Sequence, residues 1–122
     1  MAQLVVSFTN QTNFTVNKKS LIQSLELILL RLNHLGRVNI ELLLVGDEKI
    51  KLLNKKFRDM DKVTDVLSFS SNEPPAQDFY GSIVISANTA NRQAKQAGIN
   101  PQSEINTLAG HGLLHLLGYN HS

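Results

Sequence analysis

Residues 38–57 read VNIELLLVGDEKIKLLNKKF, and the fold follows from the change of pattern within them. The first part is a nearly continuous apolar run interrupted by two polar residues, which predicts a buried β-strand. After Gly46, apolar residues recur at helical spacing, at Ile50, Leu53 and Phe57. A strand that leads directly into an amphipathic helix indicates a sheet covered by helices.

The same patterns extend in both directions along the chain. Further strands are predicted at residues 4–8, 66–69 and 83–85, where apolar and β-branched residues gather. Further helices are predicted from Asn17 or Ser20 to about Asn33, from Ser86 or Asn88 to near Gly98, and from Ser103 onward. The order β-α-β-α-β-β-α-α predicts one α+β or α/β domain over residues 1–122, with one sheet packed on helices.

The helix expected to end near Asn33 leads to two further predictions. Leu27 and Leu30 widen its apolar stripe, so its second half is expected to be buried. His34 follows its last turn, where a cation suits the helix dipole, and is interpreted as structural.

Composition narrows the class of protein. The chain has 122 residues, of which 42% are hydrophobic and 18% charged, as expected for one globular domain. It has no cysteine, which excludes disulfides and thiolate metal sites and favours a reducing compartment. The start of the chain lacks a secretory signal pattern, and the most apolar stretch, Leu21 to Leu32, is too short to span a bilayer. We therefore expect a cytoplasmic protein without a membrane segment.

Positive charge is concentrated in one short window. The net charge is +2, and residues 49–62 contain six basic residues, opposed there by two aspartates. These basic residues are Lys49, Lys51, Lys55, Lys56, Arg58 and Lys62. Alone, such a run favours a solvated helix face. The alternative is a patch that faces the phosphates of a nucleic acid.

Three of the four histidines lie close together at the end of the sequence. His111 and His115 are four residues apart, so on a helix they occupy one face and can bind the same ion. Gly118 can end the helix and turn the chain, which would bring His121 toward that ion. Three imidazoles leave a fourth position open for water, the arrangement of a catalytic zinc. The spacing therefore predicts one zinc per chain, whereas the alternative is three histidines that serve only packing.

The same segment matches a protease pattern with one exception. Its spacing is that of H-E-x-x-H-x-x-G-x-x-H, but Gly112 stands in the place of the glutamate that acts as general base. A zinc protease is therefore disfavoured.

Gly110 and Gly112 lie inside the predicted last helix, where each destabilises the helix by about 1 kcal/mol relative to alanine. A close approach of another group to these glycines should compensate for this cost.

Three stretches of the chain match, in order, the motifs of one known family. Residues 111–121, HGLLHLLGYNH, resemble the H-G-x-L-H-L-x-G-Y-D-H signature of the YbeY family of bacterial rRNA-maturation endoribonucleases. Residues 53–69, LNKKFRDMDKVTDVLSF, are similar to that family's L-N-x-x-Y/F-R-x-x-D-x-P-T-D-V-L-S-F. Residues 81–86, GSIVIS, are similar to its G-D-I-V-I-S strand.

The resemblance implies an α+β fold with a mixed four-stranded sheet, a zinc ion on His111, His115 and His121, and a single-stranded RNA substrate. It also implies work on ribosomal RNA, especially the 3′ end of the small-subunit RNA, in contact with the small ribosomal subunit and in ribosome quality control. Arg58 matches the family's arginine that engages RNA or its scissile phosphate, and with His115 it is the predicted catalytic pair. The alternative for Arg58 is a surface ion pair with a neighbouring aspartate.

Four other residues have expected roles in such a mechanism. Lys55, Lys56 and Lys62 are expected to guide the RNA backbone. Asp65 is expected either to orient a metal ligand or Arg58, or simply to cap a turn.

Asn120 replaces the family's aspartate between two ligands, where it is expected to affect the orientation of a histidine. Ser82 and Val63 also depart from the motifs. These changes keep open a non-catalytic relative that binds RNA or the ribosome.

Overall fold

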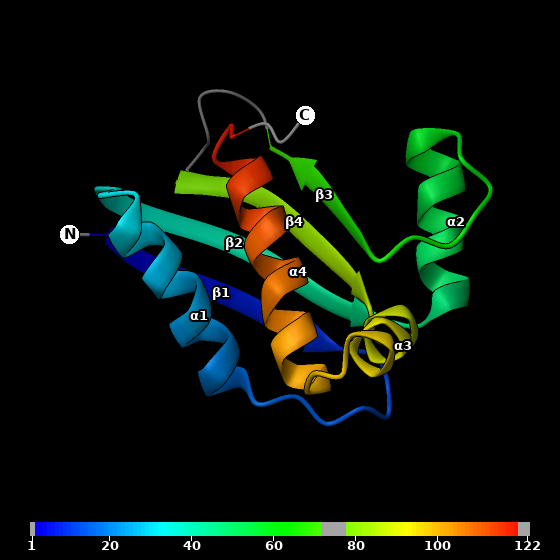
Figure 1. Ribbon diagram of the computed structural model, residues 1–122. Helices are drawn as coiled ribbons and strands as arrows, with labels where there is room; N and C mark the ends of the chain where they lie inside the picture. Colours follow the sequence, from blue (N-terminus) through cyan, green and yellow to red (C-terminus); the bar gives the residue numbers. More distant parts are fainter. Residues whose placement is uncertain (1, 72–77, 120–122) are drawn as a thin grey trace.

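A four-stranded sheet forms the centre of the molecule (Figure 1). The computed structural model describes residues 2–71 and 78–119. The strands are β1 (Ala2–Asn10), β2 (Gly36–Val45), β3 (Val66–Ser70) and β4 (Phe79–Ser86), in the spatial order β1-β2-β4-β3. Strands β1, β2 and β4 are parallel, and β3 is antiparallel to β4. The predicted mixed sheet is confirmed.

Four helices accompany the sheet in the predicted order. They are α1 (Lys18–Arg31), α2 (Asp47–Arg58), α3 (Ala87–Ala97) and α4 (Pro101–Leu116). The α+β class and the order β-α-β-α-β-β-α-α are therefore confirmed. Among the described residues, every helix is too short or too polar to span a bilayer.

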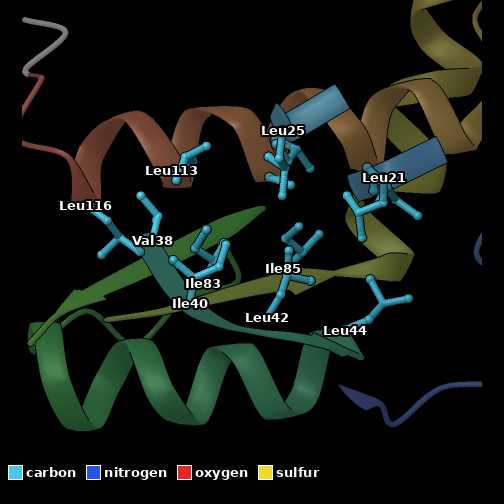
Figure 2. Close-up of a cluster of buried hydrophobic side chains, with 14 of the residues drawn as sticks. Leu21, Leu25, Val38, Ile40, Leu42, Leu44, Ile83, Ile85, Leu113 and Leu116 are labelled. Carbon is cyan, nitrogen blue, oxygen red and sulfur yellow. The ribbon is translucent and has the colours of Figure 1, made fainter. Parts of the chain in front are cut away.

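The main hydrophobic core lies between the sheet and the helices α1 and α4. Alternate residues of β2 and β4 point to this side, and the leucines of α1 and α4 close over them (Figure 2). The largest buried side chains include Leu25, Leu42, Ile83, Ile85 and Leu113. Each buried leucine or isoleucine contributes about 1.5–3 kcal/mol. This core fixes α4 across the middle of the sheet.

Helix α2 covers the opposite face of the sheet, below the strands in Figure 2. Its Ile50 packs in a second, smaller cluster with Val45, Leu67 and Val84. The loop that follows α2 leads into β3, the edge strand of the sheet, and α4 packs on the other face of that strand.

Two predictions about helices α1 and α4 were wrong. Leu27 and Leu30 are exposed, Leu30 by 64%, because α1 buries only one narrow face against the core. Helix α4 begins at Pro101 rather than at Ser103, since Asn100 caps it and accepts a hydrogen bond from the backbone of Gln102. Proline suits the first turn of a helix, where no partner for its missing N–H is needed.

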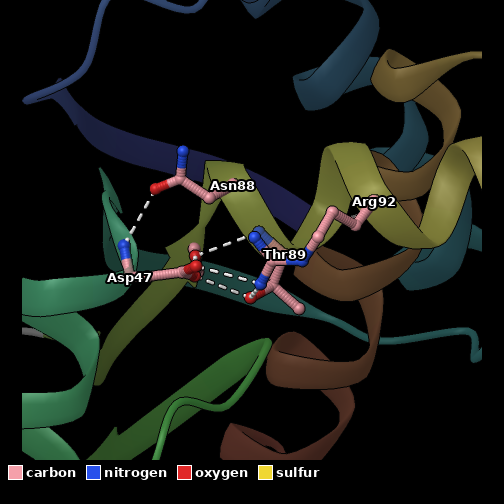
Figure 3. Close-up of polar contacts among 5 residues, drawn as sticks. Asp47, Asn88, Thr89 and Arg92 are labelled. Carbon is pink, nitrogen blue, oxygen red and sulfur yellow. Dashed lines mark hydrogen bonds and ion pairs between the residues drawn. The ribbon is translucent and has the colours of Figure 1, made fainter.

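The start of α2 is joined to α3 by a polar network around Asp47 (Figure 3). Its carboxylate accepts hydrogen bonds from Ser86 Oγ at 2.6 Å and Thr89 Oγ1 at 2.7 Å, and pairs with Arg92 at 2.9 Å. Its backbone N–H donates to Asn88 Oδ1 at 2.9 Å. Burial alone would raise the pKa of Asp47, but these hydrogen bonds and the Arg92 charge outweigh burial and lower it.

We predict that Asp47→Asn destabilises the protein at neutral pH by about 1–3 kcal/mol, since the amide loses the ion pair and cannot accept all three bonds. The folded-state pKa of Asp47 lies below its ordinary value, so the ionised carboxylate stabilises the fold above that value. This contribution is lost as the pH falls through the folded-state pKa. Urea unfolding between pH 7 and pH 3 should therefore show the two proteins converging at acid pH.

The matched control is Glu48→Gln, on the exposed neighbouring position of α2. It should lose at most about 1 kcal/mol at neutral pH, the contribution of an exposed carboxylate in the first turn of a helix. A stability difference for Asp47→Asn that stays constant down to acid pH would contradict this account of the network.

Candidate active site

A cavity of about 560 Å³ opens at the β3 edge of the sheet, between the end of α2 and the face of α4. Three segments line it. Helix α2 and the loop after it contribute Asn54, Arg58, Met60, Lys62 and Thr64, strand β3 contributes Val66, Leu67 and Ser68, and helix α4 contributes His111, Gly112 and His115. The structure thus brings the predicted arginine and two of the predicted zinc ligands to one place.

His111 and His115 lie on successive turns of α4, and both are exposed to the cavity. Two imidazoles on one helix face, open to solvent, fit the first two ligands of a zinc ion. His121, the third predicted ligand, and Asn120 lie outside the described residues. Among residues 2–71 and 78–119, no group of three or more His, Cys, Asp or Glu side chains could hold a metal ion. The site therefore depends on His121, which stays a prediction.

The end of α4 has the turn that the sequence predicts. Gly118 has φ of 91°, which favours glycine, and its N–H donates to the His115 carbonyl at 3.0 Å. The N–H of Tyr119 donates to the Leu114 carbonyl at 2.9 Å, which completes the motif that commonly ends helices. The chain therefore turns away from the helix axis at Gly118, three residues after the second histidine.

Gly112 allows α4 to approach the sheet closely. A Cβ atom at this position would lie 2.7 Å from Ile83 Cγ2 and 3.1 Å from Ser68 Oγ. At Gly110, a Cβ would lie 2.8 Å from Ile28 Cδ1, the mobile end of a side chain. The cost that both glycines impose on the helix is therefore compensated by close packing, as the sequence indicates.

Arg58 is held at the rim of the cavity by β3. Its guanidinium donates a hydrogen bond to the Ser68 carbonyl, and its central carbon lies 5.4 Å from the centre of the Phe69 ring. The ion pair in this region is formed instead by Lys55 and Asp61, at 3.9 Å. Contacts to a carbonyl and to a ring face fix the guanidinium without neutralising it, which leaves its charge available for an anion.

The three predicted RNA-binding lysines occupy different places. Lys62 lines the cavity beside Arg58. Lys55 and Lys56 lie on the exposed side of α2, with Lys56 Nζ 5.2 Å from the Phe57 ring centre. The cavity thus has a cationic rim that continues along the helix.

Asn54 is a site residue to which the sequence reasoning assigned no role. It is 3% exposed and lines the cavity. Its side-chain Nδ2 donates to the Lys62 carbonyl at 3.0 Å, and its backbone carbonyl accepts from the N–H of Met60 at 3.2 Å. It therefore fixes the loop that carries Lys62. In the sequence, the feature that could have indicated this role is the position of Asn54 four residues after Ile50, on the apolar face of an amphipathic helix.

Asp65 has the contacts of a cap. Its Oδ1 accepts from the N–H of Val66 at 2.8 Å, and its Oδ2 accepts from Gln93 at 3.4 Å. A role for Asp65 in orienting a ligand stays a prediction. His34 packs edge-on against Tyr80, with ring centres 6.1 Å apart, and its structural role stays a prediction.

Comparison with known proteins gives one consistent result. The family model described as "Endoribonuclease YbeY" matches residues 6–122. A protein of that name from Nautilia profundicola is 44% identical over 119 residues, which cover 96% of this chain and 78% of that protein. Another of that name, from a Nitratiruptor species, is 40% identical over 121 residues, 99% of this chain and 79% of that protein.

A solved structure has the same fold. The solution structure of TM1509 from Thermotoga maritima aligns with a TM-score of 0.66 and 30% sequence identity, covering 97% of this chain and 75% of that one. This chain and the Thermotoga maritima protein therefore share one fold.

We predict that Gly112→Ala destabilises the protein by about 1–3 kcal/mol, because the added methyl overpacks the contact with Ile83. This loss should exceed the gain of about 1 kcal/mol in helix propensity. The matched control, Gly110→Ala, should be close to neutral because the end of Ile28 can move. Urea unfolding measures both. A Gly112→Ala protein as stable as the wild type would show that α4 does not depend on this contact.

Proposed function

The chain belongs to the YbeY endoribonuclease family, and from this premise we propose that it is a zinc-dependent endoribonuclease that cleaves single-stranded RNA in the cavity between α2, β3 and α4. One observation carries the proposal. Two histidines of α4 and the arginine that ends α2 line the same cavity, although they come from opposite faces of the sheet. A polyanion that enters this cavity meets a metal-ligand pair on one wall and a fixed guanidinium on the other.

The charge of the cavity supports a phosphodiester substrate. Among the described residues that line it, Arg58 and Lys62 are cationic and none is an aspartate or a glutamate. A protease of the zinc type uses a glutamate next to the first histidine, and here Gly112 holds that position. The cavity therefore suits a substrate that carries its own negative charge.

His111 and His115 would hold the zinc ion, with His121 as the third ligand. When bound, zinc acts as a Lewis acid toward a phosphoryl oxygen and lowers the pKa of a bound water to about 7. The donor set fits this ion, since exposed imidazoles on one helix face are common zinc ligands.

The residues of α2 have a separate task. Arg58, held by the Ser68 carbonyl and the Phe69 ring, would bind the scissile phosphate through its planar fork and stabilise the charge that develops on it. Lys62 would add positive charge at the same wall, and Lys55 and Lys56 would bind neighbouring phosphates.

The nucleophile is either a water or the 2′-hydroxyl of the RNA. A 2′,3′-cyclic phosphate product would support the hydroxyl, and a 5′-phosphate product would exclude it.

The biological substrate that we propose is ribosomal RNA, in particular the 3′ end of the small-subunit RNA. This would place the protein in ribosome maturation and quality control, in contact with the small subunit. The relatives described above are named as endoribonucleases, which supports the class of reaction.

The first test is metal content. Protein purified without chelator or affinity tag should contain about one zinc per chain, and His115→Ala should lose the zinc and the cleavage of a single-stranded RNA. The matched control, His34→Ala, should keep both, because His34 lies beside Tyr80 and away from the cavity. Absence of metal from the wild type, even after zinc is added back, would contradict the enzymatic proposal and favour a non-catalytic RNA- or ribosome-binding relative.

The second test concerns Arg58. We predict that Arg58→Lys lowers the rate of RNA cleavage by about 100-fold, since the ammonium keeps the charge but loses the fork. Zinc content should not change. Arg37→Lys, at an exposed arginine of β2, should cleave at the wild-type rate. An Arg58→Lys protein with full activity would show that Arg58 acts only as a point charge.

A further inference from the structure

Phe57 is an exposed aromatic residue in the last turn of α2. Its side chain is 55% exposed, although it lies beside the smaller hydrophobic cluster of the protein. The ring contacts Phe69 edge to face, with ring centres 5.3 Å apart and an angle of 66° between the planes. Such a contact fixes the orientation of Phe57 and leaves much of its ring open.

Burial explains Phe69 better than it explains Phe57. Phe69 is partly buried and packs against the cluster formed by Val45, Ile50, Leu67 and Val84. Phe57 adds one contact at the edge of that cluster, and more than half of its surface faces solvent. Single exposed apolar residues are common and need no explanation. Phe57 differs from them because a cation lies over its ring and a second lies over the ring that it contacts.

Phe57 stands between two basic residues in the sequence, Lys56 and Arg58. Lys56 Nζ lies 5.2 Å from the Phe57 ring centre. The central carbon of Arg58 lies 5.4 Å from the ring centre of Phe69, which is the ring that Phe57 contacts. The Phe69 ring thus connects an exposed aromatic surface to the guanidinium at the cavity. An aromatic surface next to a row of phosphate-binding cations is the pattern of single-stranded nucleic acid binding.

We propose that Phe57 stacks against one nucleobase of the RNA, next to the phosphate held by Arg58. This inference rests on the proposed function and adds a base-binding subsite to it. The base would take the place of the Lys56 ammonium over the ring, and Lys56 would then pair with a phosphate. Every nucleobase has a face that can stack, so the subsite selects for an unstacked base rather than for a sequence. A base inside a duplex is already stacked, and the subsite would therefore favour an unpaired segment.

The absence of tryptophan from the chain allows a direct test. Phe57→Trp introduces a single tryptophan whose fluorescence should be quenched when a base stacks on it. The probe is a single-stranded 2′-O-methyl RNA, which has no free 2′-hydroxyl, and anisotropy of a labelled copy measures its binding independently. Quenching should saturate at the same oligonucleotide concentration as the anisotropy. The matched control is Phe79→Trp at the start of β4, where the side chain is 38% exposed, and it should show no quenching.

Affinity gives a second readout. Phe57→Leu should bind the probe roughly 5- to 100-fold more weakly, as expected for the loss of one stacked base, whereas Phe57→Tyr should bind like the wild type. An oligonucleotide of the same length that is abasic at every position should bind to the wild type and to Phe57→Leu equally. Circular dichroism would verify that each variant is folded.

The outcomes separate the subsite from the activity. Binding without quenching, together with unchanged affinity for Phe57→Leu, would overturn the subsite and leave the proposed nuclease standing. Failure of the wild-type protein to bind the probe at all would overturn the RNA-directed function, and the subsite with it.

Discussion

The close approach of helix α4 to strands β3 and β4 is the contact on which the site depends. Gly112 lies against Ile83 and Ser68, and a Cβ atom there would come within 2.7 Å of Ile83. The two histidines flank this glycine in the sequence, so the contact that seats the helix also sets how far the imidazoles stand from β3. The same contact excludes a larger side chain. The glutamate that zinc proteases carry at this position could not be accommodated without moving α4, and its absence is therefore a consequence of packing as well as a departure from a motif.

Helix α2 is fixed at both of its ends, which is why it can present a rigid arginine. At its start, Asp47 bonds to Ser86, Thr89 and Arg92. At its end, Arg58 bonds to the Ser68 carbonyl of the edge strand. Since β3 is the last strand of the sheet, its outer carbonyls are free to accept such a bond. The site is thus assembled at the edge strand of the sheet, between helices that lie on opposite faces.

Much of this arrangement could be predicted from local sequence. Periodicity and capping residues identify all eight elements, because the Asn17 and Ser86 caps and the turn at Gly118 are local chemistry. The helical spacing of His111 and His115 likewise places them on one face. The start of α4 was missed although its Asn100 cap is local. The other failures depend on contacts between distant segments. The exposure of Leu30 reflects which elements happen to cover α1, and the roles of Asn54 and Phe69 depend on a loop and a strand that meet α2 only in the folded chain.

The distribution of charge within the cavity limits the chemistry that its described residues can perform. They offer a guanidinium, an ammonium, imidazoles and neutral hydroxyl and amide groups, but no carboxylate. A reaction that required a carboxylate base from these residues could not proceed there. Stabilisation of negative charge is what they provide, and this is the largest need of a phosphodiester that passes through a transition state of higher charge. For RNA, the substrate itself carries a hydroxyl beside the scissile phosphate, so a cavity whose described residues offer cations and imidazoles but no carboxylate would be matched to a substrate that brings its own nucleophile.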